Sequence, residues 1–152
     1  MLFIFLTGSI FILEYYIKKY MDRTGTLQEQ RPLFNGKIIL KKYYNTGAAG
    51  NFLSSRPEWM KRIHAGMLAA VSVLLLCTLP KKRHAFAKTG LSFLAGGGAS
   101  NLHDRLSKGH VVDYFSLGFG PKRFRRLVFN LADFFVFAGI ILCMIQILAK
   151  ED

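Results

Sequence analysis

The sequence from residue 127 to residue 149 reads LVFNLADFFVFAGIILCMIQILA and decides the fold. After Asp133 this stretch carries no charged side chain. A hydrocarbon layer about 30 Å thick is crossed by roughly 20 consecutive, mostly apolar helical residues. Residues 63–79 contain a second run of this kind, VSVLLLCTL. Both stretches therefore predict helices that span a membrane.

Two weaker apolar blocks lie at residues 2–17 and 85–102. The first carries Glu14 and continues into Lys18. It has no basic stretch before its apolar run and no small-x-small cleavage site after it, which favours a retained helix over a cleaved signal peptide. The second block carries Lys88 and three consecutive glycines at 96–98. With these two blocks the chain has four predicted spans.

The polar segment between the first two spans, residues 18–62, contains the turn-forming residues Gly25, Pro32 and Asn35-Gly36. Within it, residues 37–44 favour a strand or one arm of a hairpin. The sequence has no internal repeat, linker or low-complexity tract. The expected fold is an all-α membrane protein of four transmembrane helices with a small β-rich loop region. We expect residues 1–152 to form a single domain.

The net charge is +12, from 21 Lys and Arg against 9 Asp and Glu. Because the cations lie in loops that flank apolar spans, anionic lipid headgroups fit this excess better than nucleic acid does. Cys77 and Cys143 both lie within apolar runs and are expected to be small buried hydrophobic residues. They form neither a disulfide framework nor a zinc-binding spacing.

The distribution of Lys and Arg bears on the orientation of the chain in the membrane. With four spans, both termini lie on the same side as the turn at residues 80–84. The opposite side carries ten Lys or Arg within residues 18–62 and six more between residues 105 and 126. A positive-inside count assigns this larger set to the cytoplasm. That assignment places the segment at residues 18–62 and the connection between the third and fourth spans in the cytoplasm.

Polar residues gather at the end of the third predicted span. Asn101, Asp104 and Arg105 have the i, i+3, i+4 spacing of one helix face, and we expect Asp104 and Arg105 to pair. Placing charged groups beside hydrocarbon costs free energy, so we interpret this cluster as a candidate functional site. The preceding glycines suit the close approach of another helix. A structural polar clamp between helices is the alternative.

Two acids follow near successive span ends. Asp113 lies between apolar neighbours in VVDYF, and Asp133 lies in FNLAD, where Asn130 shares its helix face. Two shielded carboxylates that meet cannot both ionise easily, so one retains a proton and the pair holds an acid and a base. Activation of a water against a peptide carbonyl requires both. A packing role for each acid separately is the alternative.

The first polar loop contains NTGAAGN at residues 45–51. Its small residues and amides suit a backbone that lies against a ligand or a substrate strand. An ordinary turn is the alternative interpretation.

These four segments, in this order, resemble the lipoprotein signal peptidases (signal peptidase II) from end to end. That family shows Asn-x-Gly-Ala-Ala, then a Gly-rich stretch leading into Asn-x-x-Asp-Arg, then Val-Val-Asp-Phe, and finally Phe-Asn-x-Ala-Asp entering the last span. The corresponding segments here are Asn45-Thr-Gly-Ala-Ala49, Asn101-Leu-His-Asp-Arg105, Val111-Val-Asp-Tyr114 and Phe129-Asn-Leu-Ala-Asp133.

By this resemblance, Asp113 and Asp133 match the catalytic aspartates. The positions that match substrate-binding or site-supporting residues are Asn45, Gly47, Asn101, Asp104, Arg105, Asn130, Glu14 and Lys18. The family carries an Asp and, four residues later, a Lys near the end of the first span, so Glu14 stands in place of Asp. The other departures are Gly50-Asn51 where Phe usually follows Ala-Ala, Ser100 for Gly, Tyr114 for Phe, and Leu127-Val128 where Pro often precedes Phe-Asn.

The resemblance implies a membrane aspartyl endopeptidase that cleaves prolipoproteins before a cysteine carrying a diacylglyceryl group. It implies no metal and no organic cofactor, and its partners are prolipoprotein substrates and membrane lipids. We expect a monomer in the bacterial cell (inner) membrane, with the site and the small extracytoplasmic β-rich loop region on the outer side, which is opposite to the side that the positive-inside count gives. One alternative is a divergent, non-catalytic paralogue that binds lipid or lipoprotein. Another is a metal-dependent hydrolase using His103, Asp104, His110 and Asp113, although seven residues separate the two histidines, which is no standard ligand spacing.

Overall fold

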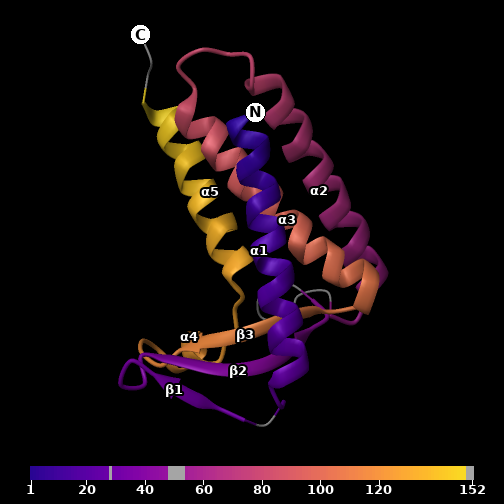
Figure 1. Cartoon of the computed structure of the whole chain (residues 1–152), viewed down its shortest axis with the longest axis vertical. Coiled ribbons are helices and arrows are strands. Elements are labelled where there is room, and N and C mark those ends of the chain that lie inside the picture. Colours follow the sequence, from indigo (N-terminus) through magenta and orange to yellow (C-terminus); the bar gives the residue numbers. More distant parts are fainter. Residues whose placement is uncertain (28, 48–53, 150–152) are drawn as a thin grey trace.

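The computed structural model describes residues 1–27, 29–47 and 54–149. In this part of the chain, four long helices run alongside one another and a three-stranded sheet lies across one of their ends (Figure 1). The long helices are α1 (Leu2–Thr24), α2 (Pro57–Thr78), α3 (Ala85–Lys108) and α5 (Leu131–Leu148). The strands are β1 (Arg31–Leu33), β2 (Ile38–Asn45) and β3 (Val111–Leu117), and the short helix α4 (Lys122–Arg125) lies at the same end. The prediction of a mainly helical chain with a small β region is confirmed.

The least apolar of the long helices, α3, packs against α1, α2 and α5. Its glycines make this possible. A Cβ at Gly96 would lie 2.8 Å from the carbonyl oxygen of Thr7 in α1, and a Cβ at Gly97 would lie 2.6 Å from that of Ala132 in α5. The predicted small-residue packing face therefore serves two different helices.

The same helix extends past residue 102, where the sequence placed its end, and finishes at Lys108. Gly109 follows in the left-handed conformation, φ 80°, and its N–H donates to the carbonyl of Arg105. In the last two turns Asn101, Asp104 and Arg105 are buried, although Ser107 is exposed. Hydropathy therefore underestimated its length.

The surface of the bundle is apolar and part of its interior is charged. Leu74 of α2 and Ile141 of α5 are 55% and 57% exposed, whereas Glu14 and Lys18 of α1 are 0% and 1% exposed. Among the described helices, α2 and α5 are long and apolar enough to cross a membrane. This distribution is the reverse of a water-soluble protein and suits an exterior in contact with hydrocarbon.

The sheet is antiparallel, in the order β1-β2-β3. The turn between β1 and β2 places Phe34, Asn35 and Gly36 at positive φ. The register of β2 against β3 shifts after Leu40, so that Tyr43 lies opposite Asp113. The predicted strand at residues 37–44 is confirmed as β2, whereas the three-residue β1 was missed because its Pro32 was interpreted as a turn former; an edge strand tolerates proline.

The outer ends of α1 and α5 lie away from the sheet (Figure 1). Figure 1 shows the start of α1, the end of α5 and the turn between α2 and α3 at the opposite end of the bundle. The start of α1 and the end of α5 therefore lie on the same side as the turn at residues 80–84, as predicted (Figure 1).

Candidate active site

A short backbone pairing joins β3 to the start of α5. The N–H groups of Tyr114 and Phe115 donate to the carbonyl of Phe129 at 2.9 and 3.0 Å, and the N–H of Phe129 donates back to the carbonyl of Phe115 at 2.7 Å. This pairing holds the strand that carries Asp113 against the helix that carries Asp133.

Asp133 is the third residue of α5 and closes a capping box with Asn130. The Asn130 side chain accepts the Asp133 N–H at 3.0 Å, and Oδ2 of Asp133 accepts the Asn130 N–H at 3.1 Å. The other oxygen, Oδ1, accepts a hydrogen bond from Asn101 Nδ2 at 3.0 Å. The start of a helix favours negative charge, and both oxygens of Asp133 have donors.

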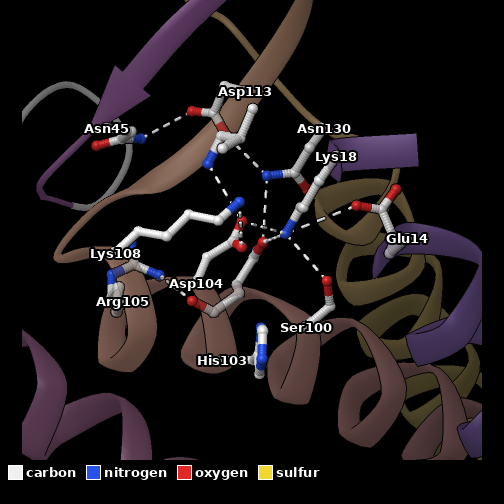
Figure 2. A network of polar contacts seen from close by, with 12 residues as sticks. Glu14, Lys18, Asn45, Ser100, His103, Asp104, Arg105, Lys108, Asp113 and Asn130 are labelled. Carbon is white, nitrogen blue, oxygen red and sulfur yellow. Dashed lines mark hydrogen bonds and ion pairs between the residues drawn. The ribbon is translucent and has the colours of Figure 1, made fainter. Parts of the chain in front are cut away.

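Asp113 lies almost completely buried on β3 between two amides (Figure 2). Its Oδ1 accepts from Asn130 Nδ2 at 2.7 Å, and its Oδ2 accepts from Asn45 Nδ2 at 3.0 Å. Burial and, after it, the charge of Asp133 raise the pKa of Asp113 to about 7. Asn130 therefore bridges the two acids, since it bonds to both.

The two acids line one cavity of about 420 Å³. Helices α2, α3 and α5 and the strands β2 and β3 contribute to its walls. The polar end holds both acids together with Asn45, Asn101 and Arg105. The remaining wall is mostly apolar and includes Met60, Met67, Leu127, Val128, Val136 and Phe137.

Lys18 of α1 is a buried cation behind the acids. Its Nζ donates to Asn101 Oδ1 at 2.7 Å and to Ser100 Oγ at 3.0 Å, and it lies 3.3 Å from Asp104 Oδ2 and 3.6 Å from Glu14 Oε2 (Figure 2). Ser100, which departs from the family glycine, supplies one of these acceptors. Because Asn101 also binds Asp133, α1 is tied to the site through this network.

Asp104 and Arg105 do not pair with each other, so that expectation was wrong. Asp104 accepts the N–H of Val112 at 3.2 Å and lies 3.2 Å from Lys108 Nζ. Arg105 turns the other way and donates to the carbonyl of Gly47 at 2.6 Å. Consecutive helical residues point to different sides, which explains the separation.

The last residue of β2, Asn45, contributes an oriented amide. Oδ1 of Asn45 accepts the N–H of Gly47 at 3.0 Å, which leaves Nδ2 directed at Asp113. The remainder of the segment at residues 45–51, including the departure at Gly50-Asn51, lies outside the described residues.

Sequence reasoning missed His64 of α2. Its ring lines the cavity, and its Nδ1 lies 3.2 Å from Nη1 of Arg105. The available signal was a lone histidine one residue into a predicted span.

The two histidines of the metal alternative face aromatic rings. His103 packs edge-on against Phe11 and Tyr15, and His110 lies 4.1 Å, centroid to centroid, from Tyr44. Within the described ranges, no three His, Cys, Asp or Glu side chains converge as metal ligands. This geometry does not favour the metal-dependent hydrolase.

Comparison with known proteins gives a consistent result. A family model described as signal peptidase (SPase) II matches residues 6–149. The lipoprotein signal peptidase of Ectopseudomonas mendocina (strain ymp) is 30% identical over 148 residues, covering 96% of this chain and 87% of that protein. That of Dichelobacter nodosus (strain VCS1703A) is 31% identical over 150 residues, covering 98% and 95%.

Two solved structures share the fold. Both are described as a bacterial membrane enzyme structure by the in meso method, at 2.3 and 1.9 Å resolution. Their TM-scores are 0.81 and 0.78 at 22% and 20% identity, covering 99% and 98% of this chain and 92% and 94% of theirs. Because the family match extends over nearly the whole length, this chain belongs to the signal peptidase II family, the lipoprotein signal peptidases.

Proposed function

We propose that this protein is a membrane aspartyl endopeptidase that removes signal peptides from diacylglyceryl-modified prolipoproteins, cleaving before the lipidated cysteine. Membership of the family supports a protease that processes prolipoproteins. The observation that carries the aspartyl chemistry is that Asp113 and Asp133 line one cavity, bridged by Asn130. Neither acid has an ion-pair partner among the described residues, so each is available to exchange a proton.

The environments of the two acids suggest different roles. The pKa of Asp113 is raised to about 7 by burial and then by the charge of Asp133, so a substantial fraction of the molecules carries a proton on Asp113 at neutral pH. The helix start and the capping N–H support charge on Asp133. Asp113 is therefore the proposed acid and Asp133 the proposed base.

The proposed reaction restores both groups. Asp133 takes a proton from water as the water oxygen attacks the scissile carbonyl carbon, and Asp113 gives its proton to the carbonyl oxygen. The neutral diol then collapses: its C–N bond breaks, the leaving nitrogen takes the proton from Asp133, and one diol hydroxyl returns a proton to Asp113. The products are a carboxylic acid and an amine, and no metal or organic cofactor takes part.

The apolar wall of the cavity supports a lipidated substrate. Met60 and Met67 face it from α2, while Val136 and Phe137 face it from α5. An acyl chain is apolar along its length, so its burial against these side chains is favourable. The peptide bond would then lie at the polar end of the cavity.

We place all four long helices across the membrane, with the sheet and cavity on the extracytoplasmic side of the bacterial cell membrane. The apolar exterior of the bundle and the position of the sheet at one end support this arrangement. The proposal treats residues 1–152 as one domain, acting as a monomer in contact with membrane lipids. The non-catalytic paralogue is not favoured, because both acids and their amide partners are retained.

The test is cleavage by the purified protein in detergent. One precursor carries a diacylglyceryl group on its cysteine, and the matched control is the same precursor without lipid. We expect cleavage of the lipidated form alone, with mass spectrometry locating the cut immediately before the modified cysteine. Equal cleavage of both forms, or of neither, would count against the proposal.

A further inference from the structure

One buried hydroxyl joins three elements of the fold. Tyr114 of β3 is 6% exposed, and its Oη donates to Glu14 Oε1 in α1 at 2.7 Å. The same oxygen accepts the N–H of Leu131, the first residue of α5, at 2.9 Å. The start of a helix leaves its first N–H groups without backbone partners, so this hydroxyl completes the start of α5.

This hydroxyl joins the two segments that carry the acids. Tyr114 directly follows Asp113, and Leu131 lies two residues before Asp133. The Tyr114 N–H also donates to the carbonyl of Phe129, just before α5. Backbone and side chain of one residue therefore both hold the strand of the first acid to the helix of the second.

Glu14 also contacts Lys18, and Lys18 leads to the site by a second chain of contacts. Glu14 is 0% exposed, and its Oε2 lies 3.6 Å from Lys18 Nζ. Lys18 donates to Asn101, which in turn donates to Asp133. Two chains of contacts thus run from α1 to Asp133, one through Tyr114 and the backbone of α5, and the other through Lys18 and Asn101.

We propose that Tyr114 and Glu14 act as a coupled pair of positioning residues that set Asp133 relative to Asp113. Neither residue lines the cavity, so neither is expected to touch substrate. A displacement of the acids, however, alters the geometry of proton transfer, on which rate depends steeply. The pair therefore acts on kcat and leaves KM nearly unchanged. This inference rests on the proposed function.

Two substitutions break the same hydrogen bond from opposite ends. Tyr114→Phe removes the hydroxyl and keeps the ring. Glu14→Asp withdraws the carboxyl group by about 1.5 Å, one C–C bond, and keeps an acidic side chain at this position. Because both changes remove one shared interaction, their effects should not multiply.

The experiment measures kcat and KM for wild type, both single variants and the double variant, on the lipidated precursor. We expect each single variant to lose about tenfold in kcat with KM within about twofold, and the double variant to be no slower than the slower single variant. The matched control is Tyr44→Phe, because the Tyr44 hydroxyl donates to Asp22 Oδ1 at 2.7 Å and likewise joins α1 to the sheet, away from the cavity. Its kcat should stay within about twofold of wild type.

Several outcomes would overturn the pairing. These are a wild-type kcat for Tyr114→Phe, a double variant whose loss equals the product of the single losses, or a loss that lies in KM. If Tyr114→Phe does not fold, judged by its melting curve, Glu14→Asp decides alone: a lower kcat at constant KM supports the proposal, and an unchanged kcat refutes it. A wild-type protein that leaves the lipidated precursor intact refutes the proposed function itself, and the positioning role with it.

Discussion

Replacing Asp104 with Ala should lower the melting temperature strongly, because three groups lose a partner together. Asp104 accepts the N–H of Val112 at 3.2 Å and lies 3.3 Å from Lys18 Nζ and 3.2 Å from Lys108 Nζ. Lys18 is 1% exposed and cannot regain water, whereas Lys108 is 28% exposed and partly can. The loss is therefore dominated by the buried Lys18 and the buried N–H.

The expected loss in the free energy of unfolding follows from these contacts. Removal of one partner from a buried ion pair destabilises a protein by about 3–5 kcal/mol, and an orphaned buried N–H by about 1–3 kcal/mol. The two effects share the same carboxylate and overlap, so we expect about 3–5 kcal/mol in total. For a chain of this size that corresponds to a fall of roughly 6–20 °C in Tm.

Thermal unfolding in one detergent measures this shift. Asp104→Asn retains an acceptor for Val112 and should lose less than Asp104→Ala. Glu58→Gln is the exposed control, because Glu58 pairs with Lys61 at the surface, and its melting temperature should not move. Asp113→Asn should show little loss of stability near pH 7. If Asp104→Ala melts like wild type while Asp113→Asn is strongly destabilised, the bracing and catalytic roles have been exchanged.

Two further predictions concern pH and topology. Burial and then the charge of Asp133 raise the pKa of Asp113 to about 7, above about 3.9 for an unfolded Asp, so between these values the folded protein binds more protons and its stability falls as pH rises. The Tm of Asp113→Asn relative to wild type should therefore increase from about pH 5 to about pH 8, and a constant difference would argue against the raised pKa. In a background with both native cysteines changed to Ala, Lys122→Cys should react with a membrane-impermeant thiol reagent in whole cells and Lys82→Cys should not. The opposite labelling would place the cavity in the cytoplasm.

The sequence was most informative where polar residues interrupt apolar runs. Asn101, Asp113 and Asp133 were singled out because charge and amide groups are unusual near a predicted span. The structure brings these side chains together with Asn45 and Asn130 around one cavity. Their catalytic or supporting roles stay predictions until variants are assayed.

Contacts between distant segments could not be predicted from the sequence. The hydrogen bond from Tyr114 to Glu14 joins two positions that each depart from the family pattern, yet no spacing rule relates them. The expectation that Asp104 and Arg105 pair was also wrong, because the side chains of consecutive helical residues point in different directions. Hydropathy also ranked α3 low, although it packs against all three other long helices, because a helix packed among helices need not be apolar.

Internal contacts account for part of the charge conflict. A positive-inside count treats every Lys and Arg as a free surface charge. Lys18 and Arg105 are instead buried in the site, Lys108 lies near Asp22 and Asp104, and Lys42 donates to the carbonyl of Asp22. Several of the cations counted against an outward-facing site are therefore committed to internal contacts.

The catalytic pair is tested most directly by the cleavage rates of Asp113→Asn and Asp133→Asn on the diacylglyceryl precursor. Both variants should stay folded and lose about 10²-fold or more in rate, and EDTA should leave wild-type cleavage unchanged. Asp22→Asn makes the same substitution outside the cavity and should cleave like wild type. A wild-type rate for Asp133→Asn, or inhibition by chelator that zinc reverses, would contradict the aspartyl pair.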